Sequence, residues 1–279
     1  MIPLSKLKKR LIQLTFCIGA TLLAINIYGL FQNMRVNHFF NSELRFYGDQ
    51  PTNYQQTMTD LTRKQNETDR AYAMRVTQVI DDGLAHIHWE RYDPAQFNQR
   101  IPVWENYFLH FMGKFSTIPE YRRYQFADYK KSLKRGIGIC GDASMILSQV
   151  LDLQGIENTI LSFPGHVVVL ATFNNGEQAI LDADFGVTAM TRKPTWAQNP
   201  DTLASRYVNA GYTKTDESFF LDLYRQEFQE WRDVEHFITK KYYFEHVSYA
   251  LKWPLPMLLI LISILYLRKL KPPVIAQNQ

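Results

Sequence analysis

The feature that most constrains this chain is Leu11 to Phe31, a run of 21 residues without a charged side chain. As a helix it would rise about 1.5 Å per residue and match the roughly 30 Å hydrocarbon core of a bilayer. The run is longer than the apolar core of a signal peptide, and no clear Ala-x-Ala cleavage site closes it. We therefore expect an uncleaved membrane anchor rather than a cleaved signal. Basic residues precede it: Lys6, Lys8, Lys9 and Arg10.

A second apolar run lies near the other end of the chain. Residues 248–267 give 20 positions with one charge, Lys252. Tyr249 and Trp253 flank that lysine and suit a membrane interface, where a lysine can extend its ammonium group into water. The sequence thus predicts a second span. Basic residues follow it: Arg268, Lys269 and Lys271.

The flanking charges predict the topology, because basic loops stay in the cytoplasm. We expect a two-pass protein of the inner (cytoplasmic) membrane of a bacterium, with both termini cytoplasmic and the central domain periplasmic or extracytoplasmic. The net charge is +4, and much of the positive excess lies at the two ends. The middle of the chain has no stripe of basic residues interleaved with aromatic ones, so we do not expect nucleic-acid binding. The predicted parts are a basic tail (1–10), a first span (11–31), an external domain (32–247), a second span (248–267) and a second tail (268–279).

The external domain reads as α+β. The chain is 46% hydrophobic and 21% charged, so a packed core is expected. Helical patterns cover Tyr54 to Trp89, with a break near Asn66, and Asp216 to Ala250. Val103 to Phe115 predicts a short aromatic helix whose stripe would pack in the core.

Metal ligation is not expected in this domain. The candidate ligands are spaced two positions apart along the chain: His86, His88 and Glu90. On a helix, neighbours in this series would point to different sides, and no fourth ligand is near. We expect neither a metal nor another cofactor.

The chain contains two cysteines, Cys17 and Cys140. Cys17 lies within the first predicted span, so Cys140 would be a single free thiol in a compartment that usually oxidises thiols. Gly141 and Asp142 open a helix after it, and the helix dipole and free amides at such a start favour a thiolate and can bind an oxyanion. The source of a second oxyanion donor stays open. The helix has a buried stripe at Ala143, Ile146, Leu147, Val150 and Leu151.

Strands follow this helix. Glu157 to Phe163 is the first and leads to a turn at Pro164 and Gly165, after which His166 begins the next. The turn at Asn175 and Gly176 returns Gln178 to Ala183 antiparallel to it, so that residues near 184 to 186 lie opposite His166. Asp182 and Asp184 share a face there, and the register leaves both open as partners of the histidine. In an acyl-transfer site, Cys140 would be the nucleophile, His166 the general base and acid, and an aspartate the group that orients the imidazole.

The order of these motifs resembles the transglutaminase-like branch of the papain-like thiol enzymes. The matching segments are Gly138 to Ala143, Gly165 to Val167, and Leu181 to Phe185. The ending Asp182 to Gly186 is also similar to that of the arylamine N-acetyltransferases. The resemblance selects Asp182 over Asp184 as the third triad member. It implies a papain/transglutaminase-like core over about residues 100–190, with the cysteine helix packed on an antiparallel sheet.

The resemblance covers about 50 residues, and Val167 stands where the family often has an aromatic residue. The expected function is therefore a membrane-anchored thiol enzyme that works through a thioester on an amide or ester of an envelope peptide, cell wall or surface glycan. Hydrolysis and transfer to an amine or hydroxyl both stay open. The alternative is an inactive transglutaminase-like scaffold in an envelope assembly complex.

Overall fold

The computed structural model describes residues 4–35, 44–46, 48–87, 100–124, 126–191 and 199–269. The chain divides into two compact units. The first, called the helical unit, comprises Met1–Asn33, Ile101–Ser116 and Phe244–Gln279. The second, called the sheet unit, comprises Met34–Arg100 and Thr117–Tyr243. The ends of the two predicted tails, 1–3 and 270–279, lie outside the described residues.

A five-stranded antiparallel sheet organises the sheet unit, in the order β6-β5-β4-β3-β7. In the β3–β4 hairpin, Phe163 pairs with His166, and between β4 and β5 Val169 pairs with Leu181. The α+β class is confirmed. The strands are β3 (Glu157–Phe163), β4 (His166–Thr172), β5 (Gln178–Asp182), β6 (Val187–Thr191) and β7 (Gln229–Trp231).

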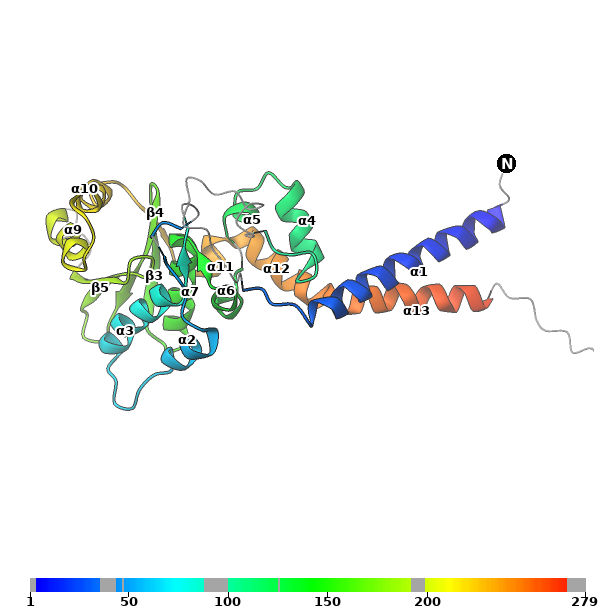
Figure 1. Ribbon diagram of the computed structural model, residues 1–279, viewed down its shortest axis with the longest axis horizontal. Coiled ribbons are helices and arrows are strands. Elements are labelled where there is room, and N and C mark those ends of the chain that lie inside the picture. The colour runs from blue at the N-terminus through cyan, green and yellow to red at the C-terminus, as the bar shows by residue number, and fades with distance from the viewer. Residues whose placement is uncertain are drawn as a thin grey trace, which may run out of the picture. The chain divides into compact units, whose positions relative to one another are not determined.

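Helices cover both faces of this sheet (Figure 1). Alternate residues of β4 point to opposite faces, as in any strand. Val167 and Val169 pack with helices α3 and α7, whereas Val168 and Leu170 pack with α9 and α10. The sheet is therefore the middle of three layers. The four helices are α3 (Asp69–Asp82), α7 (Cys140–Asp152), α9 (Pro200–Asn209) and α10 (Lys214–Leu223).

The prediction of one long helix from Asp216 to Ala250 is wrong. The chain leaves α10 after Leu223, and Gln229 to Trp231 pair with Ser162 to Ile160 at the open edge of β3. Pairing with an exposed strand edge satisfies backbone groups there, and this tertiary contact overrides local helix preference. Helix then resumes as α11 (Val234–Phe237) and α12 (Thr239–Lys252).

The predicted break near Asn66 is confirmed, since α2 (Tyr54–Asp60) ends before it and α3 begins after it. Asn66 itself has φ of 60°, in the left-handed region. The predicted helix stops at Asp82, short of Trp89, which lies outside the described residues. The remaining short elements are β1 (Ala85–His86), parallel to β2 (Ile137–Gly138), and helices α5 (Glu120–Arg123) and α6 (Tyr129–Arg135).

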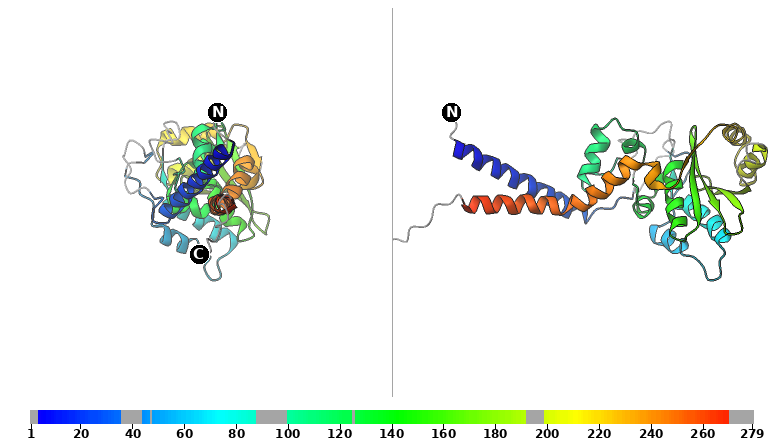
Figure 2. Two further views of the ribbon diagram at one scale, coloured as in Figure 1. Left: turned by 90° about the vertical axis from the view of Figure 1, so that its right-hand side faces the viewer. Right: turned by 180° about the vertical axis from the view of Figure 1, so that it is seen from behind.

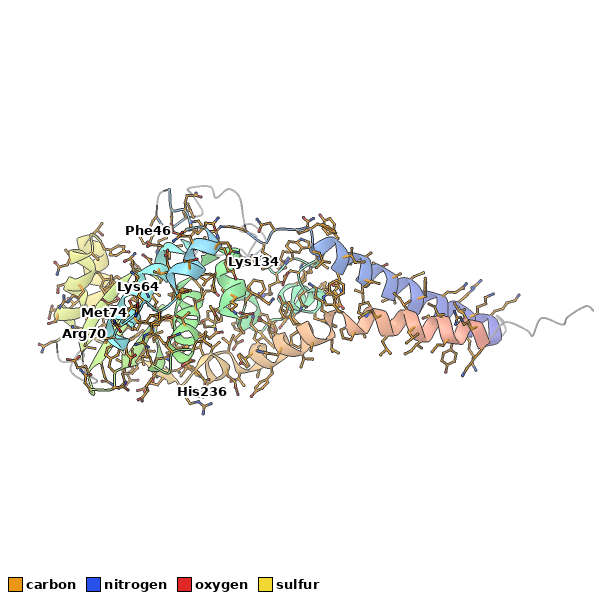
Figure 3. The ribbon with its side chains drawn as sticks, turned by 90° about the horizontal axis from the view of Figure 1, so that it is seen from below. Phe46, Lys64, Arg70, Met74, Lys134 and His236 are labelled. Carbon is orange, nitrogen blue, oxygen red and sulfur yellow. The ribbon has the colours of Figure 1, made fainter. Side chains whose placement is uncertain are left out.

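In the helical unit, α1 (Leu4–Gly29) lies beside α13 (Pro254–Lys269) (Figures 1 and 2). Gly19 allows the close approach, because a Cβ there would lie 3.0 Å from atoms of Pro256, Leu259 and Ile260. Small residues permit such packing between membrane helices. Side chains project outward along the whole pair (Figure 3).

The chain bends by 44° at the break between α12 and α13. Pro256 has no N–H to donate to the carbonyl of Lys252, four residues earlier. That carbonyl instead accepts hydrogen bonds from Asn26 Nδ2 at 2.6 Å and from the Tyr107 hydroxyl at 2.9 Å. The predicted second span, 248–267, is therefore interrupted rather than one straight helix.

Among the described residues, one helix is long and apolar enough to cross a bilayer by itself, Lys6–Gly29. The pair formed by α12 and α13 reaches that criterion only when taken together. Length and composition thus support the first predicted span more directly than the second.

The prediction that the stripe of the Val103–Phe115 helix packs in the core is wrong in part. The helix, α4 (Tyr107–Phe115), starts later because the Asn106 side chain caps it. Tyr107 is buried, but Phe111 is 50% exposed. This segment belongs to the helical unit.

Candidate functional site

Cys140 is the first residue of α7, as the sequence predicts. Before it, Gly136 ends α6 in the left-handed region, with φ of 73°, and the Asp142 carboxylate accepts the Ile139 N–H at 3.2 Å. Cys140 is half-buried. The predicted apolar stripe from Ala143 to Leu151 is buried, so packing fixes the helix whose start carries the thiol.

His166 and Asp182 come together in the interior of the sheet unit. His166 begins β4 and Asp182 ends the neighbouring strand β5. The ring nitrogen Nε2 of His166 lies 2.6 Å from Asp182 Oδ2, and both side chains are almost fully buried. Of the two aspartates that register alone leaves open, Asp182 is the one that contacts the imidazole.

The Asp182 carboxylate accepts two further hydrogen bonds. Tyr207 donates its hydroxyl to Oδ2 at 2.7 Å, and the backbone N–H of Asp184 donates to Oδ1 at 3.0 Å. Tyr207 in turn lies 2.8 Å from the hydroxyl of Tyr224, and both tyrosines are buried. Sequence reasoning missed these tyrosines because Tyr207 lies in α9 and Tyr224 directly follows α10, without a motif that links them to the strand.

The electrostatics favour a charged imidazole. Burial alone would lower the pKa of His166, but the nearby Asp182 carboxylate, its hydrogen bond and the Cys140 thiol together raise that pKa well above its ordinary value. An opposite charge and a hydrogen bond to the charged form both act in this direction. The geometry is therefore suited to a thiolate beside an imidazolium.

Asp184 also reaches the site. Its carboxylate, Cys140 Sγ and a ring nitrogen of His166 all lie within 4.8 Å of one another. Arg45 Nη1 donates to Asp184 Oδ2 at 2.5 Å, and Nη2 donates to the Asp184 carbonyl at 2.5 Å. Burial would lower the pKa of Arg45, but Asp184 raises it overall. No local pattern links Arg45 to this site, because it lies 139 residues away from Asp184 in the chain.

Thiolate, imidazole and carboxylate are donors that zinc accepts, so the close group of Cys140, His166 and Asp184 has suitable chemistry for a metal. However, the guanidinium of Arg45 already supplies a positive charge to Asp184, and it lies 4.2 Å from the ring centre of Phe185. A second cation would have to compete with it. The arrangement therefore fits a thiol–imidazole pair better than a metal centre.

A second polar group surrounds His86. Its Nδ1 lies 2.9 Å from Asp49 Oδ2, and its Nε2 lies 3.2 Å from Asp81 Oδ1 and 4.0 Å from Asp184 Oδ1. Burial would lower the pKa of His86, but the hydrogen bonds to Asp49 and Asp81 raise it to about 9. His88 and Glu90, named with His86 in the sequence, lie outside the described residues. His86 also lines an acidic pocket of about 280 Å³ with Asp49 and Asp81.

Tyr124 lies against the backbone that follows the thiol. A Cβ on Gly141 would overlap the Tyr124 ring, so any larger residue at this position would force the ring to move. Tyr124 also packs at 5.3 Å between ring centres with Phe237. The ring is therefore placed to limit access to the start of α7.

The chain matches no protein-family model, no curated protein and no solved structure.

Proposed function

We propose that this protein is a membrane-anchored thiol enzyme of transglutaminase-like type, with Cys140, His166 and Asp182 as its triad. The observation that carries the proposal is the buried 2.6 Å contact between His166 and Asp182 beside a thiol at the start of a buried helix. The raised pKa of His166 supports it, because an imidazolium stabilises a neighbouring thiolate.

In the proposed reaction, the Cys140 thiolate attacks the carbonyl carbon of an amide or ester. The imidazolium of His166 gives its proton to the leaving nitrogen or oxygen, and a thioester forms. The acceptor, which is water, an amine or a hydroxyl, then loses a proton to His166 and attacks the thioester, which releases the thiolate. Asp182 stays ionised and holds the imidazole throughout.

The membrane part of the proposal is a two-pass topology with both basic ends in the cytoplasm. The start of α1 and the end of α13 lie at the same end of the helix pair (Figure 1), and each carries basic residues. This agrees with the positive-inside rule. The sheet unit would then face the periplasm or the cell exterior, where peptides, cell wall and surface glycans are the accessible substrates.

The first test is the rate at which iodoacetamide alkylates Cys140, measured by mass spectrometry on the full chain. A Cys17→Ser background removes the other thiol. We expect His166→Ala to slow alkylation at pH 6 to 7 by about tenfold or more, since a free thiol with a pKa of about 8.5 is mostly protonated there. Equal rates in the two proteins would contradict an activated thiolate.

The second test is complementation of a deletion strain by Cys140→Ala, with abundance and membrane insertion confirmed. Loss of function at normal abundance would show that the function in cells requires the Cys140 thiol.

A scaffold without catalysis is the second candidate, favoured by the Tyr124 ring that covers the backbone next to Cys140. It predicts full function for Cys140→Ala and for a Cys140→Ser variant.

A further inference from the structure

The helix α4 carries an aromatic face that the described chain does not cover. Phe111 is 50% exposed and Phe115 is 71% exposed. Their rings stack with centres 6.0 Å apart and planes 16° apart. The opposite face, with Leu109 and Gly113, is buried. Contiguous exposed apolar surface is a feature of protein or membrane interaction sites.

Hydrogen bonds and packing hold this helix at one end of the helix pair. The Tyr107 hydroxyl donates to the carbonyl of Lys252 at the α12–α13 break. Just before α4, Glu105 accepts a hydrogen bond from the Tyr249 hydroxyl at 2.6 Å. Gly29, the last residue of α1, lies against the backbone of Trp104. The position of α4 is thus tied to the ends of both helices of the pair.

The direction of α4 is also informative. It runs across the axis of α13 in Figure 1 and in the right-hand view of Figure 2. If α1 and α13 cross a bilayer, α4 lies along the membrane surface. Two exposed apolar side chains directly follow α1: Leu30 at 68% and Phe31 at 81%. They extend the apolar surface of the predicted span toward α4.

We propose that α4 is an interfacial helix that inserts Phe111 and Phe115 into the headgroup region of the outer leaflet. The proposal rests on the proposed membrane span of α1. Amphipathic helices bind in this way, with the aromatic face in the lipid and basic groups near the phosphates. Lys114 flanks the face, with its Nζ 5.5 Å from the Phe115 ring centre, and can extend to a phosphate.

Lipid is favoured over a second copy of the chain because the patch lies at the end of the helix pair. The outward side chains of that pair are themselves apolar and exposed, for example Leu14 at 57% and Leu258 at 52%. One apolar environment can cover both surfaces, whereas a second protein copy at α4 would leave the rest of the pair without cover.

The test uses the full chain in nanodiscs, with Cys17→Ser and Cys140→Ser to remove the native thiols. Phe115→Cys is labelled with an environment-sensitive NBD dye. The matched control is Leu153→Cys, an apolar residue of the sheet unit that is 64% exposed. We expect blue-shifted emission at position 115 and at least twofold quenching by lipids that carry a nitroxide near the headgroup, with neither effect at position 153.

Two outcomes would overturn the proposal. Emission at position 115 like that at 153 would mean that the face is in water. A blue shift without quenching by lipid would mean that protein covers it, and the oligomeric state would then show a second copy.

Flotation of unlabelled protein with liposomes distinguishes failure of the interfacial-helix proposal from failure of the proposal that α1 anchors the chain in the membrane. A Phe111→Ser, Phe115→Ser variant should still float, because α1 is intact. If the wild-type chain fails to float, the anchor itself is wrong and the interfacial helix falls with it.

Discussion

Helices α7 and α1 are both apolar and each carries a cysteine, yet their surroundings are opposite. Ten of the 13 residues of α7 are buried, and the protein itself covers the helix on several sides. In α1, only 11% of the most apolar window is buried. Cys140 is half-buried beside partners, whereas Cys17 is exposed on the surface of its helix.

The difference shows two solutions to one problem. An apolar helix must leave water, and a domain core or a bilayer can each provide the apolar environment. In α7 the burial also fixes the direction of the helix start, which places the thiol beside the imidazole. In α1 the apolar surface stays outside the protein, so the helix is suited to hold the chain in a membrane.

The largest expected difference in the free energy of unfolding comes from substituting one leucine by alanine in each helix. Leu147 in α7 is fully buried and Leu14 in α1 is 57% exposed. Leu147→Ala should lower the free energy of unfolding of the sheet unit by about 2–5 kcal/mol through the cavity it leaves. Leu14→Ala should change it by roughly zero. Denaturant unfolding of the full chain in detergent, followed by tryptophan fluorescence, measures both. Equal losses would show that α1 is covered by protein.

The next effect is a pH dependence confined to the sheet unit. The pKa of His86 is raised to about 9 from an ordinary value of 6.5. A raised folded-state pKa gives stability that is fully present below pH 6.5 and is lost as pH rises through 9. The shift corresponds to on the order of 3 kcal/mol.

The measurement is the denaturant midpoint between pH 6 and 10. His166 also has a raised pKa and acts in the same direction. His86→Gln should therefore flatten the profile only in part. A profile identical to that of the wild type would contradict the role of His86.

A smaller effect is expected from the tyrosine that holds Asp182. Tyr207→Phe removes one of three hydrogen bonds to that buried carboxylate and should cost about 1–3 kcal/mol of stability. It should also slow iodoacetamide alkylation of Cys140 near neutral pH, since the imidazole loses part of its support. Tyr224→Phe, one step farther from Asp182, is the control and should alter alkylation less. A loss of stability with unchanged alkylation would make Tyr207 a packing residue only.

The smallest effect is expected at the water-facing surface of the sheet unit. Arg70 points outward from α3 (Figure 3) and pairs with Glu177 at 3.4 Å, with both side chains at least 40% exposed. Arg70→Ala should cost roughly 0–1 kcal/mol, and added salt should reduce the difference. A larger, salt-independent loss in thermal unfolding would mean that this surface is covered.

Local sequence was sufficient where the deciding interactions are close in the chain. The start of α7, the helix stripe to Leu151, the β4–β5 hairpin and the break near Asn66 all depend on neighbours within a few residues. Glycines, turn residues and the spacing of apolar side chains carry that information. The meeting of His166 with the β5 end followed from hairpin register, and the resemblance chose Asp182.

Distant contacts decided the rest. Strand β7 exists because β3 offers an open edge, and the bend before α13 follows from a proline whose missing N–H frees a carbonyl for Asn26 and Tyr107. Tyr207 and Arg45 reach the site from segments that no local pattern joins to it. By itself the sequence determined an apolar N-terminal helix, an α+β domain and the order of a thiol, an imidazole and a carboxylate. Only the tertiary structure decided which cation binds Asp184, which tyrosine supports Asp182, and which aromatic face the described residues leave exposed, because burial and long-range hydrogen bonds are set when the whole chain packs.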